Sequence, residues 1–286
     1  MAAANVLFAL TFPVSVVALR GFAPPTVTGL RFMLAACALA PIGVPALRRA
    51  SPADRRRLAL LASLGLWLQM VLIYEGIDAS RAAIAAVIVG LEPVLIALWA
   101  ALLLAERFTR RRAAGLVVGL SGSVLVAGVG SGASHPLGLA CLLGTGLTWS
   151  WYTVASKGLL GRMRPLELIA SVSVLGAAFS LVPGAIDAFA LGGWRSPGGE
   201  QWAAVVFLGL GNSVLGYMLW NRALHRLPAA AVGTSLYVQP ALGAGVSWLA
   251  LREPLPATFL PGTALVLLGL WVATGRSRVP AAATSA

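Results

Sequence analysis

"GLEPVLIALWAALLLAERFTRRRAAGLVVGLSG" at residues 90–122 and "YVQPALGAGVSWLALREPLPATFLPGTALVLLG" at residues 237–269 align without a gap at an offset of 147 residues. Each stretch carries an acid or amide followed by proline, a glutamate thirteen residues after that proline, and two glycines seven residues apart. Because these features recur at one spacing, the chain is predicted to be a tandem duplication. The paired residues are Glu92-Pro93 and Gln239-Pro240, Glu106 and Glu253, Gly115 and Gly262, and Gly122 and Gly269.

The composition is that of a membrane protein, with 59% hydrophobic and 10% charged residues. Soluble domains carry about 25% charged residues. Apolar runs of about 20 residues follow one another, which is the length that a helix needs to cross the hydrocarbon core of a bilayer. A transmembrane barrel would alternate polar and apolar residues, and these runs do not. The predicted fold class is therefore an all-α integral membrane protein.

Ten transmembrane helices are predicted, five in each copy of the duplication. Because five is odd, the second copy starts on the opposite side of the membrane, and the two copies form inverted repeats. We expect the first repeat at residues 1–131, the second at 132–277 and a cytoplasmic tail at 278–286. The predicted spans are 3–20, 25–46, 58–79, 82–105, 112–130, 136–157, 164–189, 201–221, 228–251 and 257–275.

The net charge of +12 has a topological explanation. With a cytoplasmic N-terminus, 16 of the 21 basic residues fall in cytoplasmic loops and the C-terminal tail. Four fall outside, and Arg31 lies within a span. This bias follows the positive-inside rule and predicts that both termini are cytoplasmic. The four outer basic residues are Arg20, Arg81, Arg195 and Arg252.

Other chemistries are disfavoured by the residue types present. The basic residues form no groove for nucleic acid. Cys37 and Cys141 lie in apolar segments, where buried inert thiols are expected, and two thiols make no four-cysteine metal site. We see no metal site, cofactor motif or Gly-Lys-Ser phosphate loop, and no histidine is placed to activate an intramembrane serine. The chain is not predicted to be an enzyme.

The chain resembles ten-helix members of the drug/metabolite transporter superfamily with two EamA-like repeats. The resemblance spans nearly the whole chain, and Phe8-Ala9-Leu10 departs from the aromatic-Gly pair common in its first helix. It implies export of amino acids, other metabolites or drugs through a cavity between helices 1–4 and 6–9. The matching stretches are "LTFPVSVVALRGFAPPTVTGLRF" (10–32), "YEGIDASRAAIAAVIVGLEPVLIALWAALLLAERFTRRRAAGLVVGLSGSVLVAG" (74–128) and "LPAAAVGTSLYVQPALGAGVSWLALREPLPATFLPGTALVLLG" (227–269).

Glu92 is an acid at the predicted mid-depth of an apolar helix. A charge there costs about 2.5–3.5 kcal/mol on insertion scales, so the carboxyl should face the bundle interior. Three roles are open: a proton-coupling site, a ligand for a substrate amine, or a structural brace. Pro93 and Pro240 each remove a backbone donor and are predicted to break their helices.

Arg31 and Glu75 are predicted to approach each other near the outer ends of their helices. The pair is interpreted either as a structural ion pair or as a gate that breaks when the cavity opens. Arg31 is alternatively a ligand for a substrate carboxylate, because its planar guanidinium matches that group.

Polar and aromatic residues recur at helical spacing in the spans that should face the cavity. Thr145, Trp149, Tyr152 and Ser156 share one helical face, and Ser213, Tyr217 and Trp220 share another. Such a lining suits a small amphipathic or amine-bearing solute. The predicted substrate-binding residues are Thr11, Ser15, Arg31, Trp67, Gln69, Tyr74, Glu92, Trp149, Tyr152, Ser156, Asn212, Tyr217, Asn221 and Gln239.

Two further features are interpreted as structural. Glu106 and Glu253 should accept hydrogen bonds from the amides that open helices 5 and 10, where negative charge is favoured. Gly115, Gly119 and Gly122 form a small-residue stripe suited to close helix packing, either inside the bundle or at a dimer face.

These features predict a secondary transporter that exports small metabolites by alternating access and is driven by protons or by exchange. Substrate sites of inverted-repeat transporters lie between the repeats. The alternatives are a membrane binding or scaffold protein without a transport cycle and, less favoured, an intramembrane enzyme acting on lipid. The expected partners are a small-molecule substrate and membrane lipids, in a monomer or homodimer of the cytoplasmic membrane.

Overall fold

The computed structural model describes residues 1–79, 82–106, 109–127, 136–251 and 257–274. Within these ranges every extended regular element is a helix, and β pairing is confined to an isolated bridge between Phe22 and Trp194. The predicted all-α fold is confirmed.

The elements before residue 131 run as follows: α1 (Ala2–Ala9), α2 (Thr11–Gly21), α3 (Pro24–Arg49), α4 (Pro52–Leu60), the π-helix η1 (Leu61–Trp67), α5 (Leu68–Ala79), α6 (Ala82–Leu104) and α7 (Arg110–Ala127). The later elements are α8 (Pro136–Leu160), α9 (Pro165–Ala190), α10 (Gly199–Val206), the π-helix η2 (Phe207–Gly216), α11 (Tyr217–Arg226), α12 (Ala229–Thr234), the 3₁₀-helix η3 (Ser235–Tyr237), α13 (Val238–Leu251) and α14 (Phe259–Thr274).

Five continuous helical stretches of the described chain are long and apolar enough to cross a membrane. Two shorter apolar helices, Gly90–Leu104 and Phe259–Ala273, accompany them. The exposed side chains include many leucines, valines and tryptophans, which suits a surface that faces lipid. The five stretches are Ala2–Gly21, Pro24–Arg49, Pro52–Ala79, Pro165–Ala190 and Gly199–Arg226.

The third stretch begins six residues before the predicted start at residue 58, and a local capping motif explains the difference. The Ser51 hydroxyl accepts a hydrogen bond from the backbone N–H of Asp54 at 3.1 Å. Pro52 occupies the first helical position, where a missing N–H costs nothing. This Ser-Pro-x-Asp motif starts the helix within the polar, arginine-rich segment that hydropathy assigns to a loop.

Two π-helical segments lie at equivalent positions of the sequence duplication. At the offset of 147 residues, Leu61–Trp67 corresponds to residues 208–214, which lie within Phe207–Gly216. π-Helical turns are rare in proteins, and those that occur often lie at functional sites. Both segments therefore mark the middle of long helices as places where the backbone departs from α geometry.

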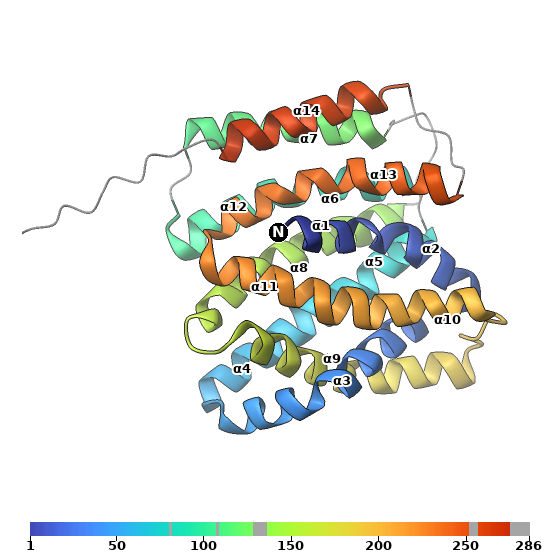
Figure 1. The fold of residues 1–286 in the computed structure, drawn as a ribbon. Helices are drawn as coiled ribbons and strands as arrows, with labels where there is room; N and C mark the ends of the chain where they lie inside the picture. Colours follow the sequence, from blue (N-terminus) through green and yellow to red (C-terminus); the bar gives the residue numbers. More distant parts are fainter. Residues whose placement is uncertain (80–81, 107–108, 128–135, 252–256, 275–286) are drawn as a thin grey trace, which may run out of the picture.

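The bundle is arranged in layers, and α7 and α14 lie side by side along one edge (Figure 1). At the opposite side of the same view α3 packs along α9. Between these pairs lie α1 and α2, α5, α6, α8 and the stretch from α10 to α13. The centre of the molecule is therefore enclosed by helices from both halves of the sequence.

Small residues allow α7 and α14 to touch backbone to backbone. A Cβ atom added at Gly115 would lie 2.7 Å from the carbonyl oxygen of Gly269, and one at Gly122 would lie 2.7 Å from that of Gly262. Gly119 meets the ring of Tyr237 in the same way. The stripe of Gly115, Gly119 and Gly122 therefore packs inside the bundle, which is one of its two predicted roles.

The pair α3 and α9 makes close contacts of the same kind. A Cβ atom at Gly29 would lie 3.4 Å from the Cα of Gly184, and one at Gly43 would lie 2.5 Å from the carbonyl oxygen of Ala170. Both helix pairs are antiparallel. A residue near the start of one helix meets a residue near the end of the other, so the contacts cross between the two helices.

Glu106 caps a different helix from the one predicted. Its carboxylate accepts hydrogen bonds from the backbone N–H groups of Ala229 at 2.8 Å and Ala230 at 3.2 Å. These amides open α12, not helix 5. Ala105, in the left-handed region at φ 52°, turns the chain at the end of α6 and precedes Glu106. The prediction was wrong because a sequence shows which glutamate ends a helix but not which helix end lies beside it. Glu253 lies outside the described residues.

Proline affects the two equivalent helices differently. α6 runs without interruption through Pro93, so the break predicted there does not divide the helix. The other helix changes from α to 3₁₀ geometry at Ser235–Tyr237, before Pro240.

The prediction of buried thiols was wrong for Cys37, which is exposed, while Cys141 is half-buried.

We expect Gly269→Ala to lower the melting temperature of the detergent-purified protein, because its new methyl group meets the backbone of Gly119. Gly158→Ala is the matched control. No atom lies within 4 Å of a Cβ at Gly158, and alanine is favoured over glycine in helices by about 1 kcal/mol. The control should be neutral or stabilising. Equal melting temperatures for both variants would contradict the assigned packing.

Glu106→Ala should speed hydrogen exchange in the first turn of α12, because the amides of Ala229 and Ala230 lose their acceptor. Mass spectrometry of exchange in detergent measures this. Glu167→Ala is the control, since Glu167 caps the backbone N–H of Arg164 at the start of α9. It should leave exchange in α12 unchanged, and faster exchange there in both variants would show general loosening instead of a lost cap.

Candidate functional site

A narrow cavity of about 50 Å³ lies at the centre of the bundle. A single water molecule needs roughly 10–15 Å³ by the same measure, so the cavity has room for a few waters and must widen to take a metabolite. Its lining comes from α1, α2, α3, α5, α6, α8, η2, α11 and α13. The lining residues are Phe8, Thr11, Phe12, Arg31, Gln69, Met70, Ile73, Glu92, Trp149, Asn212, Tyr217 and Gln239.

Arg31 on α3 is the buried cation of this cavity, with 1% of its surface exposed. Its Nε donates to Ser213 Oγ at 2.6 Å, its NH1 group to the Tyr74 hydroxyl at 2.8 Å, and its NH2 group to Asn212 Oδ1 at 2.6 Å. Its guanidinium carbon also lies 6.0 Å from the centroid of the Tyr217 ring. Two neighbouring helical stretches, Pro52–Ala79 and Gly199–Arg226, therefore hold the guanidinium in one orientation, and all three acceptors are neutral.

The predicted pair of Arg31 with Glu75 is not formed. Arg31 donates instead to Tyr74, one residue before Glu75 on α5, and to Asn212 and Ser213 on η2. Adjacent helical residues point about 100° apart, so a helix that presents Tyr74 to Arg31 turns Glu75 away from it. Glu75 instead experiences the charges of Asp78, Asp187 and Arg195.

The ion pair at this end of α5 is Arg195–Asp78, with 3.4 Å between NH1 and Oδ1. Both side chains are about 40% exposed, at 42% and 39%. Exposed pairs contribute about 0–1 kcal/mol to stability. The Arg195 NH1 group also donates to the carbonyl oxygen of Leu19 at 3.3 Å, so the loop before α10 is linked to α2 and α5.

Asn212 extends the Arg31 network to the first helix of the chain. Its Nδ2 donates to the carbonyl oxygen of Leu7 at 3.1 Å and to the hydroxyl of Thr11. The side chain thus uses its oxygen for Arg31 and its nitrogen for α1 and α2. Replacing the amide would leave buried donors and acceptors without partners on both sides.

Glu92 on α6 is the buried acid of the cavity, with 5% of its surface exposed. No hydrogen bond or ion pair of its carboxyl group occurs among the described residues, and the Ser150 hydroxyl reaches only its backbone carbonyl, at 3.4 Å. An acid without a partner in a low-dielectric site is costly and is typical of functional positions. The side chain faces the same cavity as Arg31.

Gln239 lies at the repeat position equivalent to Glu92 and also lines the cavity. Unlike Glu92, it has a partner: its Nε2 donates to Asn5 Oδ1 at 3.2 Å, and Asn5 Nδ2 donates to Ser235 Oγ at 3.0 Å. The two equivalent positions therefore differ both in charge and in hydrogen bonding.

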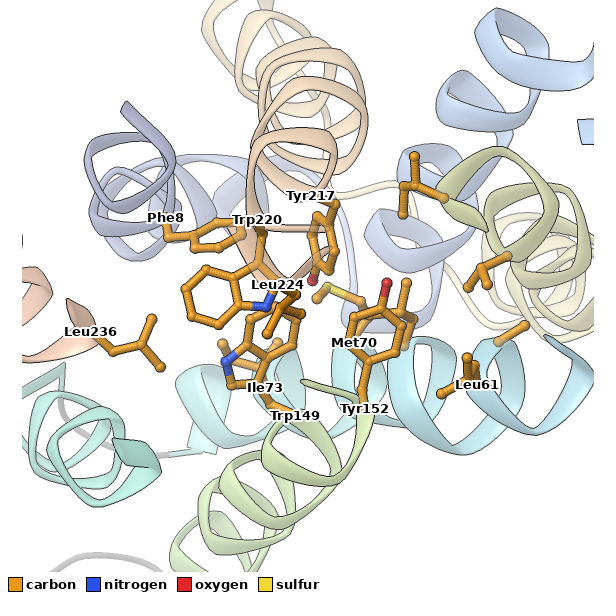
Figure 2. Packing of buried hydrophobic residues seen from close by; sticks show 14 of the residues in the cluster. Phe8, Leu61, Met70, Ile73, Trp149, Tyr152, Tyr217, Trp220, Leu224 and Leu236 are labelled. Atoms are coloured by element: carbon orange, nitrogen blue, oxygen red, sulfur yellow. The ribbon is translucent and has the colours of Figure 1, made fainter. Parts of the chain in front are cut away.

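Five aromatic rings, those of Phe8, Trp149, Tyr152, Tyr217 and Trp220, gather in one buried cluster (Figure 2). Phe8 from α1 lies edge-on to Trp149, Tyr217 and Trp220, with ring centroids 5.4 to 5.7 Å apart. Trp149 stacks on Tyr152 at 5.6 Å and an interplanar angle of 14°. Met70 and Ile73 on α5 approach the same cluster. The cavity thus has a charged and polar side and an aromatic, apolar side.

Several predicted site residues are buried near the cavity but do not line it. Tyr74 and Tyr152 are fully buried and hold other side chains, Arg31 in one case and Asn221 in the other. They support the wall and do not line it. Ser15, Trp67, Ser156 and Asn221 are likewise absent from the lining.

The sequence analysis missed Phe8, Phe12, Met70 and Ile73 as lining residues, and Asn5 as the partner of Gln239. The four apolar side chains carry no signal that distinguishes a cavity wall from a lipid-facing surface. Asn5 did carry one, because an amide within an apolar helix needs a partner. It lies close to the start of the chain, where a polar residue is easily attributed to a helix end.

Among the described residues, no group of three or more histidine, cysteine, aspartate or glutamate side chains could hold a metal ion. The chemistry of the cavity is that of a guanidinium, a carboxyl group, amides and aromatic rings. Such a set is chemically suited to a polar solute with an apolar part.

Known proteins are similar to this chain in fold and in sequence. A crystal structure of a protein with 24% sequence identity superimposes with a TM-score of 0.75 over 96% of both chains, which shows the fold. A probable terminal-alkyne amino-acid exporter of Streptantibioticus cattleyicolor is 31% identical over 95% of this chain and 91% of its own length. An aromatic amino acid exporter of Ancylobacter novellus is 30% identical over 55% of each chain.

The sequence profile of the EamA-like transporter family matches residues 1–128 and 136–275. These two matches cover nearly all of the chain, and the long apolar helices agree with a multi-pass membrane protein. The chain therefore belongs to the EamA-like transporter family, within the drug/metabolite transporter superfamily.

Proposed function

We propose that this transporter exports small metabolites, amino acids among them, across the cytoplasmic membrane by alternating access. The observation that carries the proposal is a central cavity, lined from both halves of the sequence, that holds a buried guanidinium and a buried carboxyl group with no partner among the described residues. Two relatives named as amino-acid exporters support this substrate class.

The proposed architecture is ten spans in two inverted five-helix repeats, at residues 1–131 and 132–277. The π-helical segments at equivalent positions support it. So do the crosswise glycine contacts: Gly115 and Gly122 correspond to Gly262 and Gly269, yet Gly115 meets Gly269 and Gly122 meets Gly262. Such an exchange of partners is expected about a two-fold axis. The distribution of basic residues supports cytoplasmic termini.

Alternating access requires contacts between the halves to form at one end of the cavity while they break at the other. One set joins Glu106 to the first amides of α12. Near the same end, Lys157 donates to the carbonyl oxygens of Leu224 at 2.9 Å and Leu227 at 2.5 Å, but these bonds lie within the second half and hold the end of α11 in place. Arg195 and Asp78 form the other set. Each set is small enough to be exchanged within a transport cycle.

Glu92 is the proposed proton carrier. A carboxyl group that holds a proton in one state and a substrate cation in the other links the two fluxes. Its carboxyl group has no hydrogen-bond partner in the part of the chain that the structure describes, which favours this role over a structural brace, because a brace would be hydrogen-bonded. Gln239, at the equivalent position, cannot carry a proton.

We expect Glu92→Gln to abolish pH-gradient-driven transport of amino acids in proteoliposomes while leaving substrate exchange measurable. The reason is that the amide keeps the size of the side chain but cannot titrate. Radiolabelled amino-acid flux with and without an imposed pH gradient measures both activities. Flux that responds to the gradient as in the wild type would exclude Glu92 as the proton carrier.

The double variant Glu92→Gln with Gln239→Glu moves the acid to the equivalent position on the same cavity. It should recover part of the response to the pH gradient, with a gradient-driven amino-acid flux at least several-fold above the residual flux of Glu92→Gln. Gln239→Ala in the Glu92→Gln background is the control, since it disturbs the same position without adding an acid. If the wild type moves no solute in these assays, the scaffold interpretation replaces the transporter proposal.

A further inference from the structure

We propose that the cavity binds an α-amino acid as a zwitterion, with the carboxylate on Arg31, the ammonium group on Glu92 and Gln69, and an uncharged apolar side chain against the aromatic cluster. This inference rests on the proposed function and deepens it. It assigns a recognition role to each part of the cavity lining and excludes two classes of close analogue.

Arg31 has hydrogen-bonding capacity left for an anion. A guanidinium has five N–H donors, and three of them are directed at Ser213, Tyr74 and Asn212. One N–H on each terminal nitrogen remains. Two such donors on one planar group match the two oxygens of a carboxylate.

The charge of Arg31 is also uncompensated. All three of its acceptors are neutral, and no ion pair of Arg31 occurs among the described residues. A buried cation without an anionic partner costs several kcal/mol. The protein sustains this cost and fixes the guanidinium from two neighbouring helical stretches, so the cation is preorganised for an anion that the described residues do not supply.

The ammonium site offers two acceptor groups, the carboxyl of Glu92 and the side-chain oxygen of Gln69. The Glu92 carboxyl has no partner among the described residues and faces the cavity. Gln69 also lines the cavity, is 5% exposed, and its Oε1 atom is buried without a hydrogen-bond partner. An ammonium group presents three donors, so it satisfies both residues at once.

The remaining wall selects the side chain of the amino acid. Phe8, Trp149 and Tyr217 line the cavity as rings, and Met70 and Ile73 add flexible and branched apolar surface. Arg31 and Glu92 are the charged residues in this lining, and both are assigned to the backbone groups of the amino acid. A charged side chain would be desolvated against the rings without a partner, and this site would reject it.

The test compares binding of L-phenylalanine to the purified protein with binding of phenethylamine, which lacks the carboxylate, and 3-phenylpropionate, which lacks the amine. L-Propargylglycine is a second amino-acid probe and L-lysine a charged control. Equilibrium binding in detergent gives the affinities. We expect wild type to bind the two apolar amino acids at least tenfold more tightly than the analogues or lysine, because each analogue leaves one buried charge unpaired.

The variants should separate the two ends of the ligand. Arg31→Met should lose the preference for L-phenylalanine over phenethylamine, and Glu92→Gln should lose the preference over 3-phenylpropionate. Each variant should leave the other preference within about threefold of wild type. Arg31→Lys is the matched control, since it keeps the charge without the planar fork, and it should recover part of the carboxylate preference.

Three outcomes would overturn the assignment. They are wild type binding phenethylamine or 3-phenylpropionate as tightly as L-phenylalanine, no binding of either apolar amino acid, and equal loss of all ligands in folded Glu92→Gln. If Arg31→Met does not fold, as judged by gel filtration and melting, Glu92→Gln and the wild-type comparison still decide.

The proposed function can fail separately. Efflux of phenethylamine from proteoliposomes without any amino-acid binding would retain the transporter and reject the zwitterion site. Tight amino-acid binding without flux of any solute would retain the site and reject the transporter.

Discussion

A guanidinium group enclosed in a helical bundle must find hydrogen-bond acceptors, and this requirement organises the centre of the protein. Arg31 on α3 meets it with Tyr74 on α5 and with Asn212 and Ser213 on η2. Each of these bonds joins Arg31 to another helix and so constrains the position of that helix. The first and second halves of the sequence are thereby held in register around one cavity.

Local backbone geometry makes this network possible. Asn212 and Ser213 are neighbours in sequence, yet both reach one guanidinium from within the π-helix Phe207–Gly216. The Ser213 hydroxyl also donates to the carbonyl oxygen of Leu208, five residues earlier, at 3.1 Å. π-Helical turns release carbonyl groups from the regular ladder and alter the direction of side chains. Here they bring two acceptors to the same charge.

Equivalent residues of the sequence duplication are alike in the helix packing and different in the cavity. Glycines at equivalent positions let α7 and α14 pack at backbone distance, and a repeated contact of this kind needs the same small residue in both halves. The cavity has no such need. Gln239 is tied to Asn5, whereas the Glu92 carboxyl has no partner among the described residues. Under the proposed mechanism this difference gives the cavity one site that can exchange a proton.

The sequence by itself determined the helical membrane fold, the transporter family and most of the polar cavity lining. Apolar runs of bilayer length, the 147-residue offset and isolated polar residues such as Arg31 and Glu92 are local or periodic signals. They do not depend on knowing which helices touch. Only the tertiary structure decided the partners: Arg31 with Tyr74, not Glu75; Glu106 with α12, not the start of α7; and Phe8 within the aromatic cluster. These contacts join residues that are 43 to 141 positions apart in the sequence. In the case of Arg31, the structure also selects one of two adjacent residues on the same helix, Tyr74 and not Glu75. Which of them forms is set by the rotation and packing of whole helices, and no stretch of sequence encodes that locally.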